Sequence, residues 1–486
     1  MAEQSLKKIA VNGIGWSAAD AFIGQGVTFI VGLVLARLLL PEEYGLIGIV
    51  TIFTTILLGF VDCGFSSALI RKQEVSDDDY YTLFIVNMTA SVLMCLLLFI
   101  AAPKIADFFM RMELVPLLRV MGFILIFQAL SIVQMTILSR RIDFKTKTKA
   151  SFISATLSGL IGIVMAFKGY GVWALIAHQL SRQLLYSVCL WTLNKWYPKM
   201  KFSADSFRYM WNFGWKLMLS GLLERIWNQL NQMVIGKYYS PVSLGQFSRS
   251  SEYSTFFSSN FGAIVQRVSF PALAQLQGER DRMVSAYRKV IKMTIFVSAI
   301  VTISMGAVSE PLIYCMIGPQ WHEAATYLPL LCLAMSLYPI HAINLNMLQI
   351  QNRTDLYLYF EIIKKIVGIV PILIGIFVSI YWMLIASVIF SFFAFFLNTS
   401  YSGRSLGYST WMQLKDMAPS YAVAFAVAIS VYFLKYLPLS NWIILPLQII
   451  VGIAVFGVIN ETVKLEEYCE VKNIAFEYIR KLTKQS

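Results

Sequence analysis

Charged residues are scarce in this sequence. Asp, Glu, Lys and Arg together make up 14% of its 486 residues, whereas about 25% is usual in soluble domains. Apolar residues reach 58%, so too few charges remain to cover a globule of 55.0 kDa. This balance excludes a soluble protein. Long unbroken apolar runs, such as residues 46–60, do not alternate as the strands of a membrane barrel would. The composition therefore predicts an all-α polytopic membrane protein.

Residue patterns that hold metals or nucleotides are also missing. The six cysteines form no CxxC pair, and the three histidines (His178, His322 and His341) are far apart in the sequence. No GxxxxGK[ST] pattern is present, so the phosphate-binding loop of an ATPase is not expected. We therefore predict no metal, no cofactor and no catalytic residues.

Apolar runs of membrane-spanning length are what the sequence has instead. A bilayer core needs about 20 apolar residues per helix, and 14 candidate spans can be found on this basis. Spans 7 and 8 hold many polar residues, and losing both would leave 12 spans with the same topology. The expected limits are 14–38, 44–69, 80–102, 115–138, 150–167, 171–193, 209–235, 244–273, 291–308, 327–350, 362–378, 380–397, 417–434 and 442–459.

The basic residues predict the orientation of these spans. If the N-terminus lies in the cytoplasm, the inside segments carry about 26 Lys and Arg and the outside segments about 6. Cytoplasmic loops are enriched in Lys and Arg, so both termini are expected to be cytoplasmic. The same rule accounts for the net charge of +13, and no nucleic-acid partner is expected.

The two halves of the chain resemble each other. Leu35-Ala36-Arg37 with Pro41 and Gly45 resembles Ile235-Gly236-Lys237 with Pro241 and Gly245, at an offset of 200 residues. Six spans in each half predict two lobes that run in the same direction, a known transporter plan. The sequence thus predicts an N-lobe at 1–203, a C-lobe at 204–405, two extra helices at 406–463, and an amphipathic cytoplasmic tail at 464–486.

Ionisable and amide side chains follow one face of span 8. Arg249, Glu252, Asn260 and Arg267 have the spacing of a single helix face. Charged groups inside a membrane are costly and suggest function. One alternative stays open, because Arg249 and Glu252 also have the i,i+3 spacing of an ion pair that only packs helices. Snorkelling at a helix end is the alternative for Arg267.

A second polar stripe follows span 7. It contains Lys216, Glu224, Arg225 and Asn228, with snorkelling again the alternative for Arg225. The two stripes together predict a water-filled, net-positive central cavity between the lobes. Arg grips phosphate in bidentate fashion, and amides bind hydroxyl groups, so the cavity suits an anionic cargo that carries sugars. In span 1, Asp20 is a candidate for coupling to protons or Na⁺, or else a helix-packing residue.

A family resemblance rests on two motifs. The run from Leu35 to Gly45 (LARLLLPEEYG), followed by Phe60-x-Asp62-x-Gly64-Phe65, resembles polysaccharide exporters of the multidrug/oligosaccharidyl-lipid/polysaccharide superfamily. The closer likeness is to bacterial flippases for O-antigen, capsule or colanic-acid repeat units.

This resemblance implies a function and a location. Such flippases move undecaprenyl-pyrophosphate-linked oligosaccharides from the cytoplasmic to the outer leaflet of the bacterial inner membrane. Alternating access is the expected mechanism, and membrane lipids and polysaccharide assembly proteins are the further expected partners. In the related lipid II flippases, arginines of span 8 matter, and Arg249 and Arg267 match them by position. Span 1 of those flippases carries an Arg-Asp cluster, but Asp20 has no neighbouring arginine here.

The sequence disfavours two alternative functions. A multidrug and toxin extrusion antiporter exports organic cations and needs a carboxylate-rich cavity, which the arginine excess disfavours. A membrane glycan polymerase or ligase needs catalytic groups on a sizeable outer loop, and the outer segments near 103–114 and 309–326 offer few. We therefore expect a transporter and not an enzyme.

The predicted topology can be tested by cysteine-accessibility labelling. Cysteines introduced near Lys147 and Arg280 should react only from the cytoplasmic side. Cysteines near Lys104 and His322 should react in intact cells, because those positions lie in the segments poor in basic residues. Labelling near Lys147 from outside would overturn the orientation.

Overall fold

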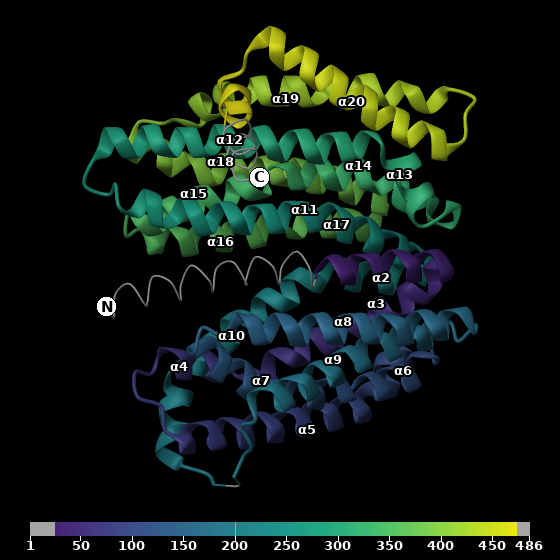
Figure 1. The fold of residues 1–486 in the computed structure, drawn as a ribbon, viewed down its shortest axis with the longest axis vertical. Helices are drawn as coiled ribbons and strands as arrows, with labels where there is room; N and C mark the ends of the chain where they lie inside the picture. Colours follow the sequence, from purple (N-terminus) through teal and green to yellow (C-terminus); the bar gives the residue numbers. More distant parts are fainter. Residues whose placement is uncertain (1–24, 200, 474–486) are drawn as a thin grey trace, which may run out of the picture. The chain divides into compact units, whose positions relative to one another are not determined.

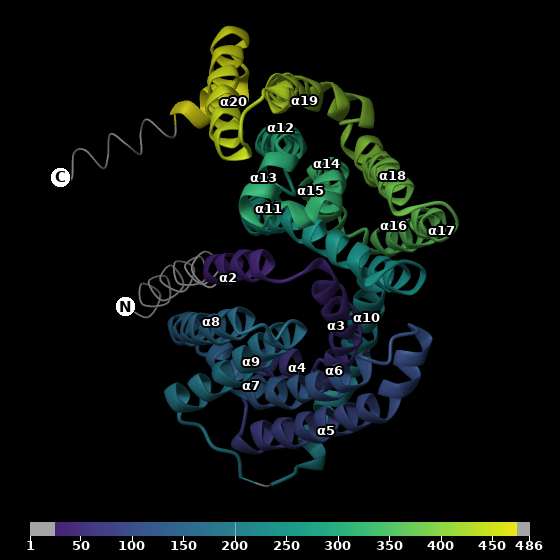
Figure 2. The same ribbon diagram turned by 90° about the vertical axis from the view of Figure 1, so that its right-hand side faces the viewer.

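The protein is all-helical in the part that the structure describes. The computed structural model describes residues 25–199 and 201–473, and every regular element within them is a helix. The chain forms two compact units, Met1–Gly245 and Gln246–Ser486, which Figures 1 and 2 colour from purple to teal and from teal to yellow. The all-α class predicted from composition is confirmed.

The first unit contains α2 to α10. These helices are α2 Gln25–Leu38, α3 Pro41–Asp62, α4 Phe65–Arg71, α5 Asp77–Phe108, α6 Leu114–Met121, α7 Phe123–Arg140, α8 Phe144–Phe167, α9 Val172–Asn194 and α10 Ala204–Tyr238.

The second unit contains most of α11 and the helices that follow it. They are α11 Pro241–Ala274, α12 Arg280–Ala307, α13 Ser309–Met316, η2 Pro319–Trp321, α14 His322–Ser336, α15 Tyr338–Ile350, α16 Thr354–Val367, α17 Ile369–Phe377, α18 Ile380–Leu406, α19 Thr410–Tyr432, η3 Phe433–Tyr436 and α20 Asn441–Val463.

Nine helical segments within the described residues are long and apolar enough to cross a membrane. They coincide with predicted spans 2–5, 9, 10 and 12–14. Helices α9, α10, α11 and the α16–α17 pair occupy other predicted spans but are more polar or shorter. The first predicted span lies partly outside the described residues. The number of 14 spans therefore stays a prediction, whereas a multi-pass membrane protein is shown.

Helix α10 belongs to the first unit because it packs on α3 and α4 (Figure 2). The break between α3 and α4 places Gly64 at φ +70°, and a Cβ there would lie 2.7 Å from the carbonyl oxygen of Gly214 on α10. The motif Phe60–Phe65 therefore makes a close backbone contact that tolerates only glycine. This unit ends later than the predicted N-lobe, and the lobes at 1–203 and 204–405 stay a prediction.

The first turns of α3 and α11 touch each other in a reciprocal way. A Cβ on Gly45 would overlap the carbonyl oxygen of Pro241, and a Cβ on Gly245 would overlap that of Pro41. Proline at the first helical position fits because its missing N–H would have no helical partner there. Each half of the sequence repeat thus supplies one proline and one glycine to the same contact, which supports the predicted duplication.

A broken helix recurs at corresponding places in the two halves. Helices α6 and α7 are separated at Gly122, and α14 and α15 are separated at Leu337. Pro116-Leu117-Leu118 resembles Pro329-Leu330-Leu331 at an offset of 213 residues, and the two prolines lie on the first helix of each pair. The two pairs share an architecture that the apolar pattern alone did not resolve.

The core of the second unit is built around α12. Tyr287, Ile291, Ile295 and Ala299 lie four residues apart on this helix and are fully buried. Helices α14 and α19 pack along α12, and the same core cluster includes residues of α15 and α18 (Figure 1).

The segment after α20 is tied to α12 by ion pairs. Lys292 binds Glu466 at 2.7 Å and Glu467 at 3.1 Å, and Lys289 binds Glu470 at 2.6 Å. Residues 466–473 are helical, so the described part of the predicted tail is docked. The remainder, 474–486, lies outside the described residues.

Replacing Gly45 by alanine should destabilise the protein, because the added Cβ has no space against Pro241. Overpacking of this kind costs about 1–3 kcal/mol, which thermal unfolding in detergent would detect. Gly221→Ala is the matched control, because no atom lies within 4 Å of a Cβ at that helical position. The control should be neutral or slightly stabilising. A Gly45→Ala variant as stable as wild type would contradict the backbone crossing.

Candidate functional site: two polar stripes on α10 and α11

The predicted stripe of span 7 lies on α10. Ser203 caps the start of this helix by accepting a hydrogen bond from the backbone N–H of Ser206. Lys216, Glu224, Arg225 and Asn228 are all exposed in the first unit. The helix therefore presents charged and amide groups away from the core of this unit.

Arg225 lies against α3. Its Nη1 donates to the backbone carbonyl of Thr55 at 3.4 Å. Its Cδ would be 3.2 Å from a Cβ on Gly59, so the glycine leaves room for the arginine stem. The carboxylate of Asp62 is close enough to attract the guanidinium. Arg225 thus uses one of its five N–H donors in a hydrogen bond to a carbonyl, and the other donors can reach a ligand.

The other three side chains of this stripe are less constrained. The Lys216 ammonium lies 5.9 Å from the centre of the Trp215 ring. Glu224 and Asn228 make no hydrogen bond or ion pair with the residues that the structure describes. Polar groups that are exposed and uncommitted can bind water or a hydrophilic cargo.

The stripe of span 8 lies on α11 and contains an ion pair. Arg249 Nη2 lies 2.7 Å from Glu252 Oε2, and 14% of the arginine side chain is exposed against 46% of the glutamate. The i,i+3 pair predicted as the packing alternative therefore exists. It is asymmetric, because the cation is largely buried and the anion is half in solvent. Tyr253, the residue after Glu252, is 6% exposed and therefore also belongs to the buried face of α11.

The two polar residues further along α11 have different environments. Asn260 donates its Nδ2 to the backbone carbonyl of Phe256 at 2.7 Å, so part of the amide is used within the helix. Arg267 is exposed and forms no ion pair within the described residues. Eighteen residues separate it from Arg249, which is about 27 Å along the helix axis. Only Arg267 of this pair is available to a ligand without breaking an existing contact.

The structure thus places four of the eight described site residues on α10 and the other four on α11. Lys216, Glu224, Arg225 and Asn228 share α10, and Arg249, Glu252, Asn260 and Arg267 share α11. A cavity between the predicted lobes stays a prediction. Asp20 lies outside the described residues. Within the described residues no three His, Cys, Asp or Glu side chains come together as a metal site would require.

Of two positioning residues in the structure, Gln246 was missed from the sequence and Asp62 was noted there only as part of a motif. Gln246, just after the α11 crossing, donates to the carbonyl of Gln320 at 2.7 Å and accepts from the N–H of Ala324 at 3.0 Å. Asp62 accepts from the backbone N–H of Ser66 at 3.3 Å and from its hydroxyl. The signal for Asp62 was its place in the motif Phe60–Phe65, whereas Gln246 carried none.

Comparisons with known proteins place this geometry in a family. A family model described as "Polysaccharide biosynthesis protein" matches residues 34–326. The "Succinoglycan biosynthesis transport protein ExoT" of Rhizobium meliloti (strain 1021) is 26% identical over 327 residues, which are 67% of this chain and 66% of that protein. The "Lipopolysaccharide biosynthesis protein WzxC" of Escherichia coli (strain K12) is 22% identical over 441 residues, which are 87% of this chain and 89% of that protein. The chain therefore spans slightly under two thirds of the first relative and most of the second.

A solved structure has the same fold. The "Lipid II flippase MurJ, inward closed conformation" superposes with a TM-score of 0.72 at 15% identity, over 94% of this chain and all of that one. This match supports the all-helical membrane fold that the composition predicted.

A double-mutant cycle should reveal the coupling between Arg249 and Glu252. Because the pair is partly solvent-exposed, we expect a coupling energy of about 1 kcal/mol in thermal or denaturant unfolding. The pair Arg282–Glu279 has the same i,i+3 spacing but is far more exposed, at 71% and 51%. This control pair should couple by less than about 0.5 kcal/mol. Strictly additive effects at Arg249 and Glu252 would contradict the ion pair.

Proposed function

Because this chain belongs to the polysaccharide biosynthesis protein family, we propose that it is a flippase for undecaprenyl-pyrophosphate-linked oligosaccharide repeat units. It would move them from the cytoplasmic to the outer leaflet by alternating access, for surface polysaccharide biosynthesis. The single observation that carries this proposal is the family match over an all-helical, multi-pass chain. The relative that bears the words "transport protein" for succinoglycan supports a transporter over an enzyme.

The polar stripes supply the chemistry that such a cargo needs. Arg225 and Arg267 are exposed guanidinium groups, and Lys216 is an exposed ammonium. A pyrophosphate accepts bidentate hydrogen bonds from arginine and attracts lysine as a point charge. The amides of Asn228 and Asn260 would bind sugar hydroxyls.

The carboxylates of the stripes limit how tightly the anion is held. Glu252 already neutralises Arg249, and Glu224 lies next to Arg225 on the same helix. A transporter has to release its cargo, so a site in which carboxylates offset part of the positive charge suits transport better than a permanent clamp. Asp20 remains the proposed site of proton or Na⁺ coupling.

The location follows from the same proposal. The chain would lie in the bacterial cytoplasmic membrane, with both termini in the cytoplasm. Its N-lobe, C-lobe and two extra helices would follow the boundaries predicted from the repeat. Lipid-linked oligosaccharide and polysaccharide assembly proteins would be its partners. A cation antiporter is disfavoured because the described stripes expose more basic than acidic side chains.

Export should depend on the exposed arginines. Arg225→Ala and Arg267→Ala should each lower the surface glycan of a strain that lacks its own flippase, while the protein stays in the membrane. A lost charge-assisted hydrogen bond weakens binding by about 1.5–3 kcal/mol, roughly tenfold to hundredfold. Arg225→Lys should be intermediate, because lysine keeps the charge but loses the fork.

Arg282→Ala is the control for these variants, because Arg282 is an exposed arginine outside both stripes. It should export normally. Wild-type export by both stripe variants would refute the anion site, and accumulation of glycan polymerised by the purified protein would refute the flippase.

A further inference from the structure

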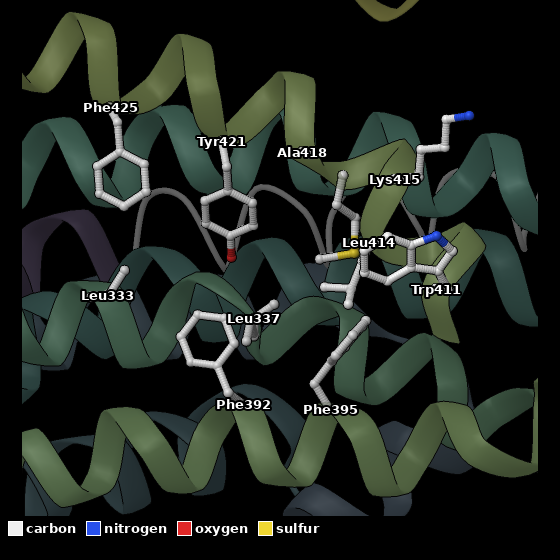
Figure 3. A pocket seen from close by; sticks show the side chains of 11 residues that line it. Leu333, Leu337, Phe392, Phe395, Trp411, Leu414, Lys415, Ala418, Tyr421 and Phe425 are labelled. Carbon is white, nitrogen blue, oxygen red and sulfur yellow. The ribbon is translucent and has the colours of Figure 1, made fainter. Parts of the chain in front are cut away.

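An apolar groove opens on the second unit between α19 and the helices α14 and α18. Its volume is about 530 Å³. Figure 3 shows Leu333, Phe392 and Phe395 on one wall, with Tyr421 and Phe425 of α19 facing them. The residues that line it lie within one compact unit, so the groove is independent of how the units are placed.

The groove wall offers almost no polar group to a ligand. Tyr421 brings a hydroxyl into it, and that hydroxyl is already hydrogen-bonded to Ser336 Oγ at 2.8 Å. The remaining lining is aliphatic or aromatic except at the rim. A long apolar chain is therefore the occupant that the wall fits, since a polar molecule would lose its hydrogen bonds with water there.

The length of the groove suits one leaflet of a bilayer. Trp411 and Phe425, both lining residues, are 14 residues apart on α19. That separation is about 21 Å along the helix, compared with about 15 Å for half of a bilayer core of about 30 Å. A single acyl chain of a membrane lipid can lie along it from the interface inward.

The rim of the groove carries an unneutralised cation. Lys415 is exposed, and its side chain extends beyond the apolar lining (Figure 3). It forms no ion pair with the described residues, because the neighbouring Asp416 is held by Arg288 at 2.5 and 2.6 Å and by Tyr408 at 2.7 Å. Trp411 beside it is largely exposed, as aromatic residues at a membrane interface are.

We propose that this groove is a binding site for an anionic glycerophospholipid, with an acyl chain along α19 and its phosphate at Lys415. Basic pockets between membrane helices on the cytoplasmic side bind anionic headgroups, and the predicted topology puts Lys415 on that side. The lipid would be a resident partner of the fold, and the site does not depend on the proposed cargo.

The test uses the purified full-length protein in detergent with added phosphatidylglycerol or phosphatidylcholine. Phosphatidylglycerol should raise the unfolding temperature at lower concentration than phosphatidylcholine and should be retained in native mass spectrometry. Lys415→Gln should weaken phosphatidylglycerol binding about fivefold, which is about 1 kcal/mol. The variant should leave phosphatidylcholine unchanged.

Matched variants separate the groove from general lipid effects. Ala418→Trp should fill the groove and abolish the preference, because Ala418 is part of its lining. Ala426→Trp is the control on the same helix, exposed but outside the lining. Lys149→Gln is the control for charge, since Lys149 is an exposed lysine of the first unit. Both controls should behave like wild type.

Three outcomes would overturn the assignment. Equal affinity for the two phospholipids would remove the role of Lys415, and an unchanged Lys415→Gln variant would do the same. Displacement of phosphatidylglycerol by an equal concentration of a polyprenyl pyrophosphate would assign the groove to an isoprenoid lipid instead. Because no glycan or transport is measured, failure here would leave the flippase proposal standing.

Discussion

The crossing of two backbones at Pro41–Gly45 and Pro241–Gly245 is the constraint on which the helices around it depend. Only glycine permits such an approach, since any Cβ would overlap a carbonyl group of the other helix. The crossing fixes where α3 and α11 begin, and α3 then carries the surface on which α10 packs. Glycines at 45 and 245 permit the crossing at the start of α11, and Gly64 and Gly214 permit the close packing of α10. Polar contacts made by Gln246 and Arg225 add to this placement.

Much of the fold could be predicted because hydrocarbon solvates no backbone group, which forces long apolar helices. Spans such as Asp77–Phe108 and Asn441–Val463 can be recognised in the sequence for that reason. The breaks at Gly122 and Leu337 could not be recognised in the sequence, because both halves of each broken helix are apolar. The packing of α10 in the first unit could not be predicted either. It includes the contact of Gly214 on α10 with Gly64, and neither glycine has a side chain that would mark it in the sequence.

The candidate site divides in the same way. Helical spacing identified which residues share a face, and the i,i+3 pair of Arg249 and Glu252 exists as that spacing allowed. Spacing does not reveal burial, so the contrast between enclosed Arg249 and exposed Arg267 needed coordinates. Thr55, which receives Arg225, acts through its backbone carbonyl, and no side-chain pattern could have signalled it.

The ion pairs between α12 and the segment after α20 can form only late in the synthesis of these residues. Lys292 and Glu466 are 174 positions apart, which at about 5–20 residues per second is roughly 9–35 seconds of translation. During that interval the lysines of α12 have been made but Glu466, Glu467 and Glu470 have not, so the lysines lack these ion-pair partners. Neutralisation comes only when residues 466–470 have been synthesised. Under the topology predicted from the basic residues, the uncompensated lysines would favour the cytoplasmic side during insertion, and they later join α12 to the segment after α20.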